Sequence, residues 1–426
     1  MALSSVEKAT AGSAADAPKK AVFALVLIIS LFFLWAITSN LLPVLIPHLK
    51  KATGVNTLQA SLVDSAYWVA YFLLAIPAGM MMKRIGYKTT IITGLLLAAA
   101  GAFLFPLAAD LRSFGFFLFA LFVVASGMTF LETSANPYIR EFGSADSYSQ
   151  RLNFAQAFNG LGAVVATNLL NRLILSDGLV KKDEELLLLS AAEKDVYYSN
   201  LFGSVKIPYM IIGATLVVFA LLFVFTKLSD GQKKEQKKIR FFNPLKFPQL
   251  SRSMAAQFFY VGAQVCLSSF FILYAEKSAG LSLNRANTFL GLLLICFMLG
   301  RYAGAFLMKK YPPAALLTWF ASASVFLSLI IVFVGGMPGV IAFLGVEFFM
   351  SIMYPTIFSL GISKMGEKTE IAAAYLVMMI VGGAFLPPLL GLIADKSGIQ
   401  LAYVVPLVCF IIIVLYARKE RQIAIA

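Results

Sequence analysis

Residues 206–252 decide the fold of this chain: KIPYMIIGATLVVFALLFVFTK is followed by LSDGQKKEQKKIRFFNPLKFPQLSR. The first part, 206–227, is apolar and has the length of about 20 residues that a helix needs to cross a bilayer. The second part, 228–252, holds the densest cluster of Lys and Arg in the chain. This pattern predicts a transmembrane helix that ends in a long basic linker on the cytoplasmic side.

Similar apolar runs, separated by charged or turn-rich segments, occupy the rest of the sequence. The twelve predicted spans are 22–48, 58–82, 88–109, 114–139, 150–176, 206–227, 253–276, 286–308, 313–334, 338–362, 369–394 and 400–417. We therefore expect an all-α integral membrane protein of twelve transmembrane helices in two pseudo-symmetric six-helix bundles. The bundles are 1–227 and 253–426, and 228–252 joins them. The segment 177–205 lies outside the spans and favours a short surface helix.

The composition supports this interpretation. The chain is 60% hydrophobic and 13% charged, which is more apolar surface than a soluble domain can bury. Its three cysteines lie in apolar runs, so we expect no disulfide. The sequence has no phosphate-binding P-loop, no His and Cys set with metal-ligand spacing and no G-x-S-x-G element. We therefore expect neither an enzyme nor a protein with a cofactor or metal centre.

Lys and Arg are distributed unevenly over the two sides of the predicted bundle. An even number of spans puts both termini on one side, and that side holds 23 of these residues against 11 on the other. The positive-inside rule then predicts cytoplasmic N- and C-termini. Because the basic residues follow this rule, the net charge of +14 reflects membrane topology and does not indicate a nucleic-acid partner.

The two predicted bundles repeat three features in the same order. A Gly followed by a basic pair ends spans 2 and 8, a Pro lies within spans 4 and 10, and a Gly pattern lies within spans 5 and 11. The offsets between matching features are about 218 to 226 residues. Parallel repeats of this kind are typical of secondary transporters whose binding site lies between the halves.

Several motifs carry a resemblance to a known family. The loop motif GMMMKRIGYK (79–88) resembles a signature of the major facilitator superfamily, although Lys83 stands where an acid is usual. The chain is more specifically similar to the fucose–galactose–glucose:proton symporter family. The motifs that carry this likeness are SLFFLWAITSN (30–40), AYFLLAIPAG (70–79), FLETSANPY (130–138), RLNFAQAFNGLGA (151–163), QFFYVGAQ (257–264) and MSIMYPTIFSLGI (350–362).

Glu132 is the leading candidate for a functional side chain. It lies within a predicted span, where ionisable groups are rare and usually functional. Asn136 follows one turn later on the same face. The resemblance implies that Glu132 faces a central cavity and takes part in proton-coupled sugar binding. A purely structural hydrogen bond between helices is the alternative.

Asp64 is the second candidate for ion coupling. Members of the resembled family carry an aspartate in span 1, in a stretch like NDILIP, but this chain has Pro43 there. Asp64, on the neighbouring span, either replaces that proton carrier, binds sodium through its carboxylate, or caps the helix near the outer surface. The sequence leaves these three roles open.

Neutral polar residues suit the hydroxyl groups of a sugar. Gln156 and Asn159 lie on one face of span 5, while Tyr260 and Gln264 lie on one face of span 7. We predict that these four residues line the site together with Asn40, Asn136 and Glu132. The alternative for such amides is to hold membrane helices together.

Other polar and aromatic residues in the spans are weaker candidates for the site. Trp35, Tyr67, Trp68 and Tyr354 offer aromatic faces, but such rings more often pack or anchor at the interface. We expect Arg301 to make a structural pairing near the cytoplasmic half, and Glu347 to pair with another helix.

The resemblance, together with these residues, implies a monomeric multi-pass transporter of the bacterial inner (cytoplasmic) membrane. It would carry a monosaccharide, L-fucose or a hexose, together with a proton or sodium. Its partners are then the sugar and the lipid bilayer. An uncoupled sugar facilitator, suggested by Pro43, and a membrane sugar sensor or scaffold are the alternatives.

Overall fold

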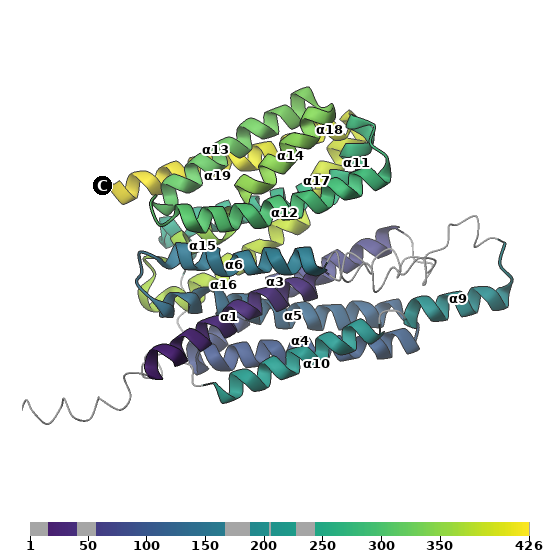
Figure 1. The fold of residues 1–426 in the computed structure, drawn as a ribbon, viewed down its shortest axis with the longest axis horizontal. Helices are drawn as coiled ribbons and strands as arrows, with labels where there is room; N and C mark the ends of the chain where they lie inside the picture. Colours follow the sequence, from purple (N-terminus) through teal and green to yellow (C-terminus); the bar gives the residue numbers. More distant parts are fainter. Residues whose placement is uncertain (1–15, 41–56, 167–187, 204–205, 227–242, 426) are drawn as a thin grey trace, which may run out of the picture.

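The computed structural model describes residues 16–40, 57–166, 188–203, 206–226 and 243–425. These residues form helices and the segments that connect them (Figure 1). Ten helices, or runs of consecutive helices, within the described ranges are long and apolar enough to cross a membrane. Each of the twelve predicted spans coincides with at least part of a helix.

The first group of helices covers the first six predicted spans. It consists of α1 (Asp16–Asn40), α3 (Thr57–Ile85), α4 (Tyr87–Asp110), α5 (Phe114–Tyr138), α6 (Tyr148–Val165) and α10 (Lys206–Phe225), with the short η1 (Ile139–Phe142) after α5. Two of these fall outside the ten candidate spans. The apolar part of α1 that the structure describes is short, and α6 carries Arg151 and four amide side chains.

The second group covers the last six predicted spans, and several of its helices are interrupted. In chain order it consists of η3 (Pro244–Lys246), α11 (Pro248–Ala279), α12 (Leu283–Leu307), α13 (Pro313–Leu329), η4 (Ile330–Val334), α14 (Gly336–Met350), α15 (Met353–Ile362), η5 (Gly366–Lys368), α16 (Thr369–Met378), η6 (Met379–Val381), α17 (Gly382–Ser397), α18 (Ile399–Ala402) and α19 (Val404–Ile425).

The two groups lie side by side and meet along a few helices (Figure 1). Within the first group, α4 packs against α5 and α10, and α1 packs against α6. Within the second, α11 packs against α17 and α19, and α12 packs against α14. The groups meet where α6 contacts α12 and α15, and where α3 and α5 contact α16. These helices therefore form the central contact between the two groups.

Close helix contacts depend on glycine. A Cβ on Gly300 in α12 would lie 2.1 Å from the carbonyl oxygen of Phe348 in α14. A Cβ on Gly382 would lie 2.0 Å from the carbonyl oxygen of Phe258 in α11. Membrane helices associate by van der Waals packing, which is strongest where small residues let the backbones approach. These glycines therefore hold the helices around the centre of the second group together.

A further helix, α9 (Ala191–Gly203), lies in the segment that was predicted to form a surface helix. Arg112, at the α4–α5 turn, donates to Asp195 Oδ1 at 2.5 Å and also to Ser199 in α9. The hydrogen bond from Arg112 lowers the pKa of Asp195. This exposed contact fixes α9 against the end of the first group.

Candidate functional site

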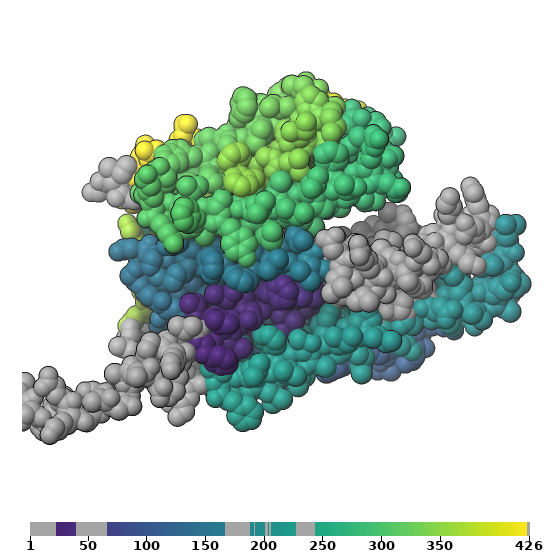
Figure 2. Space-filling model, viewed as in Figure 1, coloured from purple at the N-terminus to yellow at the C-terminus, as the bar shows by residue number. Residues whose placement is uncertain are grey.

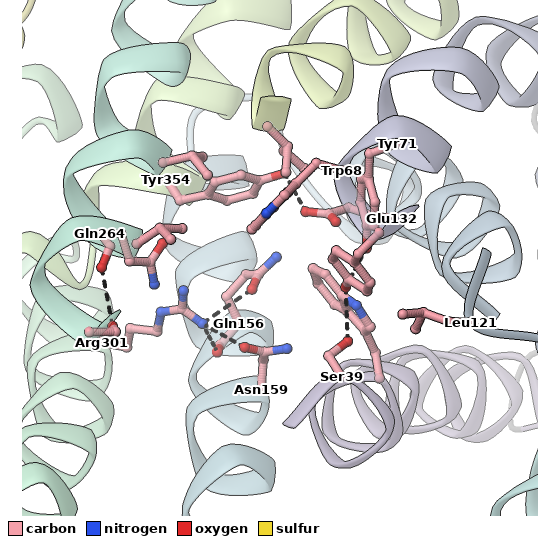
Figure 3. A pocket seen from close by; sticks show the side chains of 16 residues that line it. Ser39, Trp68, Tyr71, Leu121, Glu132, Gln156, Asn159, Gln264, Arg301 and Tyr354 are labelled. Atoms are coloured by element: carbon pink, nitrogen blue, oxygen red, sulfur yellow. Dashed lines mark hydrogen bonds between the residues drawn. The ribbon is translucent and has the colours of Figure 1, made fainter. Parts of the chain in front are cut away.

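A cavity of about 350 Å³ lies between the two groups of helices (Figure 3). Its volume is within the range of small-molecule sites, about 300 to 1,000 Å³. The side chains that line it come from both groups, so neither group forms the cavity alone. They are Trp35, Ser39, Tyr67, Trp68, Tyr71, Leu121, Glu132, Gln156 and Asn159 from the first group, and Val261, Gln264, Val265, Ser268, Arg301, Tyr354 and Ile380 from the second.

Glu132 supplies the carboxyl group of the cavity. It lies in α5 and is 2% exposed. The hydroxyl of Tyr354, in α15 of the other group, donates to Glu132 Oε1 (Figure 3). The second oxygen, Oε2, has no hydrogen-bond partner among the described residues. Since an unsatisfied buried oxygen costs free energy, this atom favours a proton or a ligand that donates a hydrogen bond.

Arg301, in α12, supplies the cation of the cavity. Its Nε donates to the carbonyl oxygen of Ser351 at 3.1 Å. Its Nη1 donates to the carbonyl and side-chain oxygens of Gln156, at 2.6 and 3.2 Å, and to Asn159 Oδ1 at 3.4 Å. Pro355 explains the first contact, because proline has no N–H to bond the carbonyl four residues earlier. Arg301 therefore joins α6 to the break between α14 and α15.

The amides of α6 also bond to other helices of the first group. Gln156 Nε2 donates to Asn136 Oδ1 at 3.0 Å, and the carbonyl of Asn136 accepts the hydroxyl of Tyr148 at 3.0 Å. Asn159 Nδ2 donates to the carbonyl of Phe32, in α1, at 3.3 Å. Gln156 and Asn159 thus face the cavity while they are oriented by neighbouring helices.

Aromatic side chains of α1 and α3 form the opposite wall of the cavity. The hydroxyls of Tyr67 and Tyr71 lie 3.3 Å apart, and Ser39 Oγ lies 3.2 Å from the Tyr67 hydroxyl. The rings of Tyr67 and Trp68 meet edge to face at 5.3 Å. The wall therefore offers apolar ring faces and hydroxyl groups, which together suit a small ligand with both C–H and O–H surface.

Polar contacts between the two groups close one end of the cavity. They lie where α6 begins and α15 ends: Ser149 Oγ is 2.6 Å from Ser359 Oγ, and Asn153 Nδ2 donates to Thr356 Oγ1 at 3.2 Å. Further along, Arg140 donates to Thr369 at 3.3 Å. Ser149, Asn153, Thr356 and Ser359 are all buried. This layer, which we call the α6–α15 seal, separates the cavity from the end of the bundle that carries Arg140.

The predicted site residues fall into three sets. Glu132, Gln156, Asn159 and Gln264 line the cavity. Asn136 lies behind it, and Tyr260 is buried with its ring 6.2 Å from that of Tyr354. The side chains of Asn40 and Asp64 lie outside the described residues, as does Pro43.

One charged side chain pairs as expected and one does not. Arg301 pairs with other helices through backbone and side-chain oxygens, and it also lines the cavity, which was not predicted. Glu347 is 5% exposed and makes no hydrogen bond or ion pair with any described residue, so its predicted pairing is not found there. Tyr71 lines the cavity and was not predicted, since nothing in its sequence surroundings separates it from a packing residue.

The sequence of residues 27–379 matches the family model of the Major Facilitator Superfamily. The chain belongs to this superfamily. The chain is 39% identical over 409 residues to the L-fucose-proton symporter of Escherichia coli (strain K12), with 93% of each chain covered. It is 35% identical over 400 residues to a glucose/galactose transporter of Brucella abortus, with 92% of this chain and 93% of the relative covered. These relatives place it in the fucose–galactose–glucose:proton symporter family.

Solved structures agree with this membership. The crystal structure of FucP, a Major Facilitator Superfamily transporter, in the outward conformation is 37% identical in sequence. The TM-score is 0.87, and the match covers 94% of this chain and 99% of that one. The human organic anion transporter MFSD10 is 15% identical, with a TM-score of 0.66, and shares the fold alone. The predicted all-helical membrane fold and the predicted family are therefore confirmed, and the chain is a transporter-family protein and not an enzyme.

Proposed function

We propose that this protein is a secondary active transporter that carries a monosaccharide, L-fucose or a hexose, together with a proton. The relatives named an L-fucose-proton symporter and a glucose/galactose transporter support the substrate class. The observation that carries the proposal is the hydrogen bond from Tyr354 to Glu132. It links a group that can take up a proton to the opposite half of the transporter, inside the cavity.

Glu132 couples proton and sugar in this proposal. When it is ionised, Glu132 has two acceptor oxygens and holds Tyr354 with one of them. When it is protonated, Oε2–H donates to a sugar hydroxyl while Oε1 still accepts from Tyr354. Burial disfavours the ionised form. The proton removes the buried charge, and the sugar hydroxyl then accepts the hydrogen bond from Oε2–H, so each stabilises the binding of the other. Release of the proton on the cytoplasmic side then weakens sugar binding.

The other residues of the cavity recognise the sugar. Gln156, Asn159 and Gln264 offer amide donors and acceptors for ring hydroxyls. Trp35 and Trp68 offer ring faces to the C–H surface of a pyranose. Because a site built to bond one hydroxyl rejects a sugar that lacks it, these few contacts decide which monosaccharide is carried.

Alternating access requires the α6–α15 seal to open and close. With cytoplasmic termini, as the distribution of Lys and Arg predicts, the seal lies on the cytoplasmic side and the cavity faces outward. The match to FucP in the outward conformation supports this orientation. Rocking of the two halves about the cavity would then break the contacts of Ser149 and Asn153 and expose the sugar to the cytoplasm.

Uptake into proteoliposomes tests the proposal. Purified protein would be given radiolabelled L-fucose, D-galactose or D-glucose under an inward proton gradient, an inward sodium gradient or neither. With one proton per neutral sugar, a gradient of one pH unit supports about tenfold accumulation of the carried sugar. Failure of every sugar to accumulate under both gradients would contradict coupled transport.

Sodium is the second candidate cation, because Asp64 lies in α3 and the acid expected near Pro43 is missing. Accumulation under the sodium gradient alone would favour it. Equilibration with counterflow but without accumulation would favour an uncoupled facilitator.

A further inference from the structure

A second hollow lies on the side of the helix bundle, where the two halves meet. It has a volume of about 610 Å³ and lies between α6 and α12, with α1 at its edge. Figure 2 shows this face, with α1, α6 and α12 side by side in purple, blue and green. Farther along, α6 and α12 touch, because a Cβ on Gly160 would lie 3.2 Å from the Cα of Met298. The two helices are thus closer together at Gly160 than at the end of the hollow where Lys309 lies.

Two cations stand at this end of the hollow, and neither has a counter-anion among the residues that the structure describes. Within these residues, Arg151 donates to backbone oxygens of Ile139, Arg140 and Ser144 and to the hydroxyl of Ser147. These four contacts leave one of its five N–H donors unused.

Lys309 is exposed, and its ammonium lies 5.4 Å from the ring centroid of Phe306. No carboxylate among the described residues pairs with Lys309 or with Arg151, and the acids of the adjacent loop, Glu141 and Asp146, are exposed and pair with neither. The end of the hollow thus carries positive charge that no described side chain neutralises.

The remaining wall of the hollow is apolar and aromatic. Phe154 in α6 is 44% exposed, and Phe306 in α12 is 70% exposed. The rings of Phe154 and Tyr302 meet edge to face across the two halves, at 6.2 Å. Leu25 and Ile29 of α1 complete this wall. Its apolar surface extends away from the two cations along the direction of the membrane-spanning helices.

We propose that this hollow binds one anionic phospholipid, with its phosphate head group at Arg151 and Lys309 and an acyl chain between Phe154 and Phe306. Basic pockets between transmembrane helices at the cytoplasmic surface are suited to anionic head groups. A free phosphate would use the cations but leave the aromatic wall uncovered, whereas a phospholipid satisfies both. Because α6 belongs to one half and α12 to the other, the bound lipid bridges the two halves.

Lipid titration followed by native mass spectrometry tests the proposal. Delipidated protein in detergent would be titrated with phosphatidylglycerol and with phosphatidylcholine of the same acyl chains. We expect tighter binding of one phosphatidylglycerol. Lys309→Gln should weaken that binding about fivefold, as expected for one basic residue near a membrane surface. The matched control is Lys310→Gln, which removes the adjacent exposed lysine outside the hollow and should leave the binding unchanged.

A second variant tests the apolar wall. Phe306→Ala, at a side chain exposed enough to be removed without loss of the core, should weaken the binding of both lipids. Equal binding of the two lipids by the unaltered protein, or equal losses for the two lysine variants, would overturn the proposal. Displacement of the lipid by millimolar glycerol phosphate would also overturn it, since it would show an anion site alone. Because no transport is measured, the result is independent of the proposed sugar symport.

Discussion

At the scale of residues, the chemistry of this transporter centres on a carboxyl with two unlike oxygens. Glu132 Oε1 accepts from Tyr354 in the opposite half, while Oε2 has no partner among the described residues. The hydrogen bond of Oε1 thus depends on the relative position of the halves, while Oε2 is available to bind a proton or a ligand. A group with both responses can couple proton and sugar to the movement of the halves, because a ligand shifts a conformational equilibrium only through its different affinity for the two states.

Replacement of Glu132 tests this role. Glu132→Gln keeps the size and the acceptor oxygen for Tyr354 but cannot release a proton. We expect accumulation under a gradient of one pH unit to fall from about tenfold to equality with the outside, while counterflow of labelled sugar persists. The dependence of counterflow on pH should also disappear. Tracer uptake in proteoliposomes measures all three.

Glu347→Gln is the matched control for this experiment. Glu347 is an equally buried glutamate of the other half that does not line the cavity. It should accumulate sugar like the unaltered protein. Full accumulation by Glu132→Gln would show that another group carries the proton.

Part of the site could be predicted from the sequence. Glu132 is distinguished by the rarity of acids in spans, and Gln156 and Asn159 by their spacing on one helix face. The environment of Arg301 could not be predicted, because its partners include main-chain carbonyls, which every residue has. Only the local break around Pro355 makes the Ser351 carbonyl available, and hydropathy does not reveal that break.

At the scale of elements, close approach of α12 and α14 places Arg301 beside Ser351. Gly300 allows that approach, so Gly300→Ala should push the helices apart. Overpacking of this kind costs about 1 to 3 kcal/mol, and we expect the apparent Tm in detergent to fall by several degrees. The control is Gly115→Ala in α5, where an added Cβ meets nothing within 4 Å. It should leave the Tm unchanged or slightly raised. Equal Tm values for the two variants would contradict the packing argument.

The α6–α15 seal gives a second prediction at this scale. The Ser149 and Ser359 hydroxyl oxygens lie 2.6 Å apart, so Ser149→Cys with Ser359→Cys should form a disulfide under oxidation. The experiment requires a background in which Cys266, Cys296 and Cys409 are replaced. Oxidation should abolish uptake while sugar binding persists, and a reductant should restore uptake. The two single variants are the controls. Normal uptake by fully cross-linked protein would show that the seal need not open.

The spans themselves were predictable, because a bilayer imposes the same apolar length on every helix. Their interruptions were less so. The break between α14 and α15 and the short η6 lie within continuous apolar runs, and only Pro355 and the Gly382–Gly383 pair mark them in the sequence. The length of an apolar run predicts that it crosses the membrane, whereas a break within it depends on contacts with other helices.

At the scale of the whole molecule, the two halves meet at the cavity, at the seal and at the hollow between α6 and α12. Movement of one half against the other therefore changes all three places together. The approximate repeat in the sequence predicted two halves, but it did not show which side chains cross between them. Tyr354 and Glu132, 222 positions apart in the chain, are brought together only by the packing of the complete protein.

The most direct measurement of the central claim is proton movement driven by sugar alone. Proteoliposomes containing a pH-sensitive dye would receive an inward gradient of L-fucose, D-galactose or D-glucose with no imposed pH gradient. If the protein is a sugar:proton symporter, the carried sugar should acidify the lumen, and Glu132→Gln should abolish the signal. Entry of the sugar, shown by tracer, without any change in luminal pH would contradict the account.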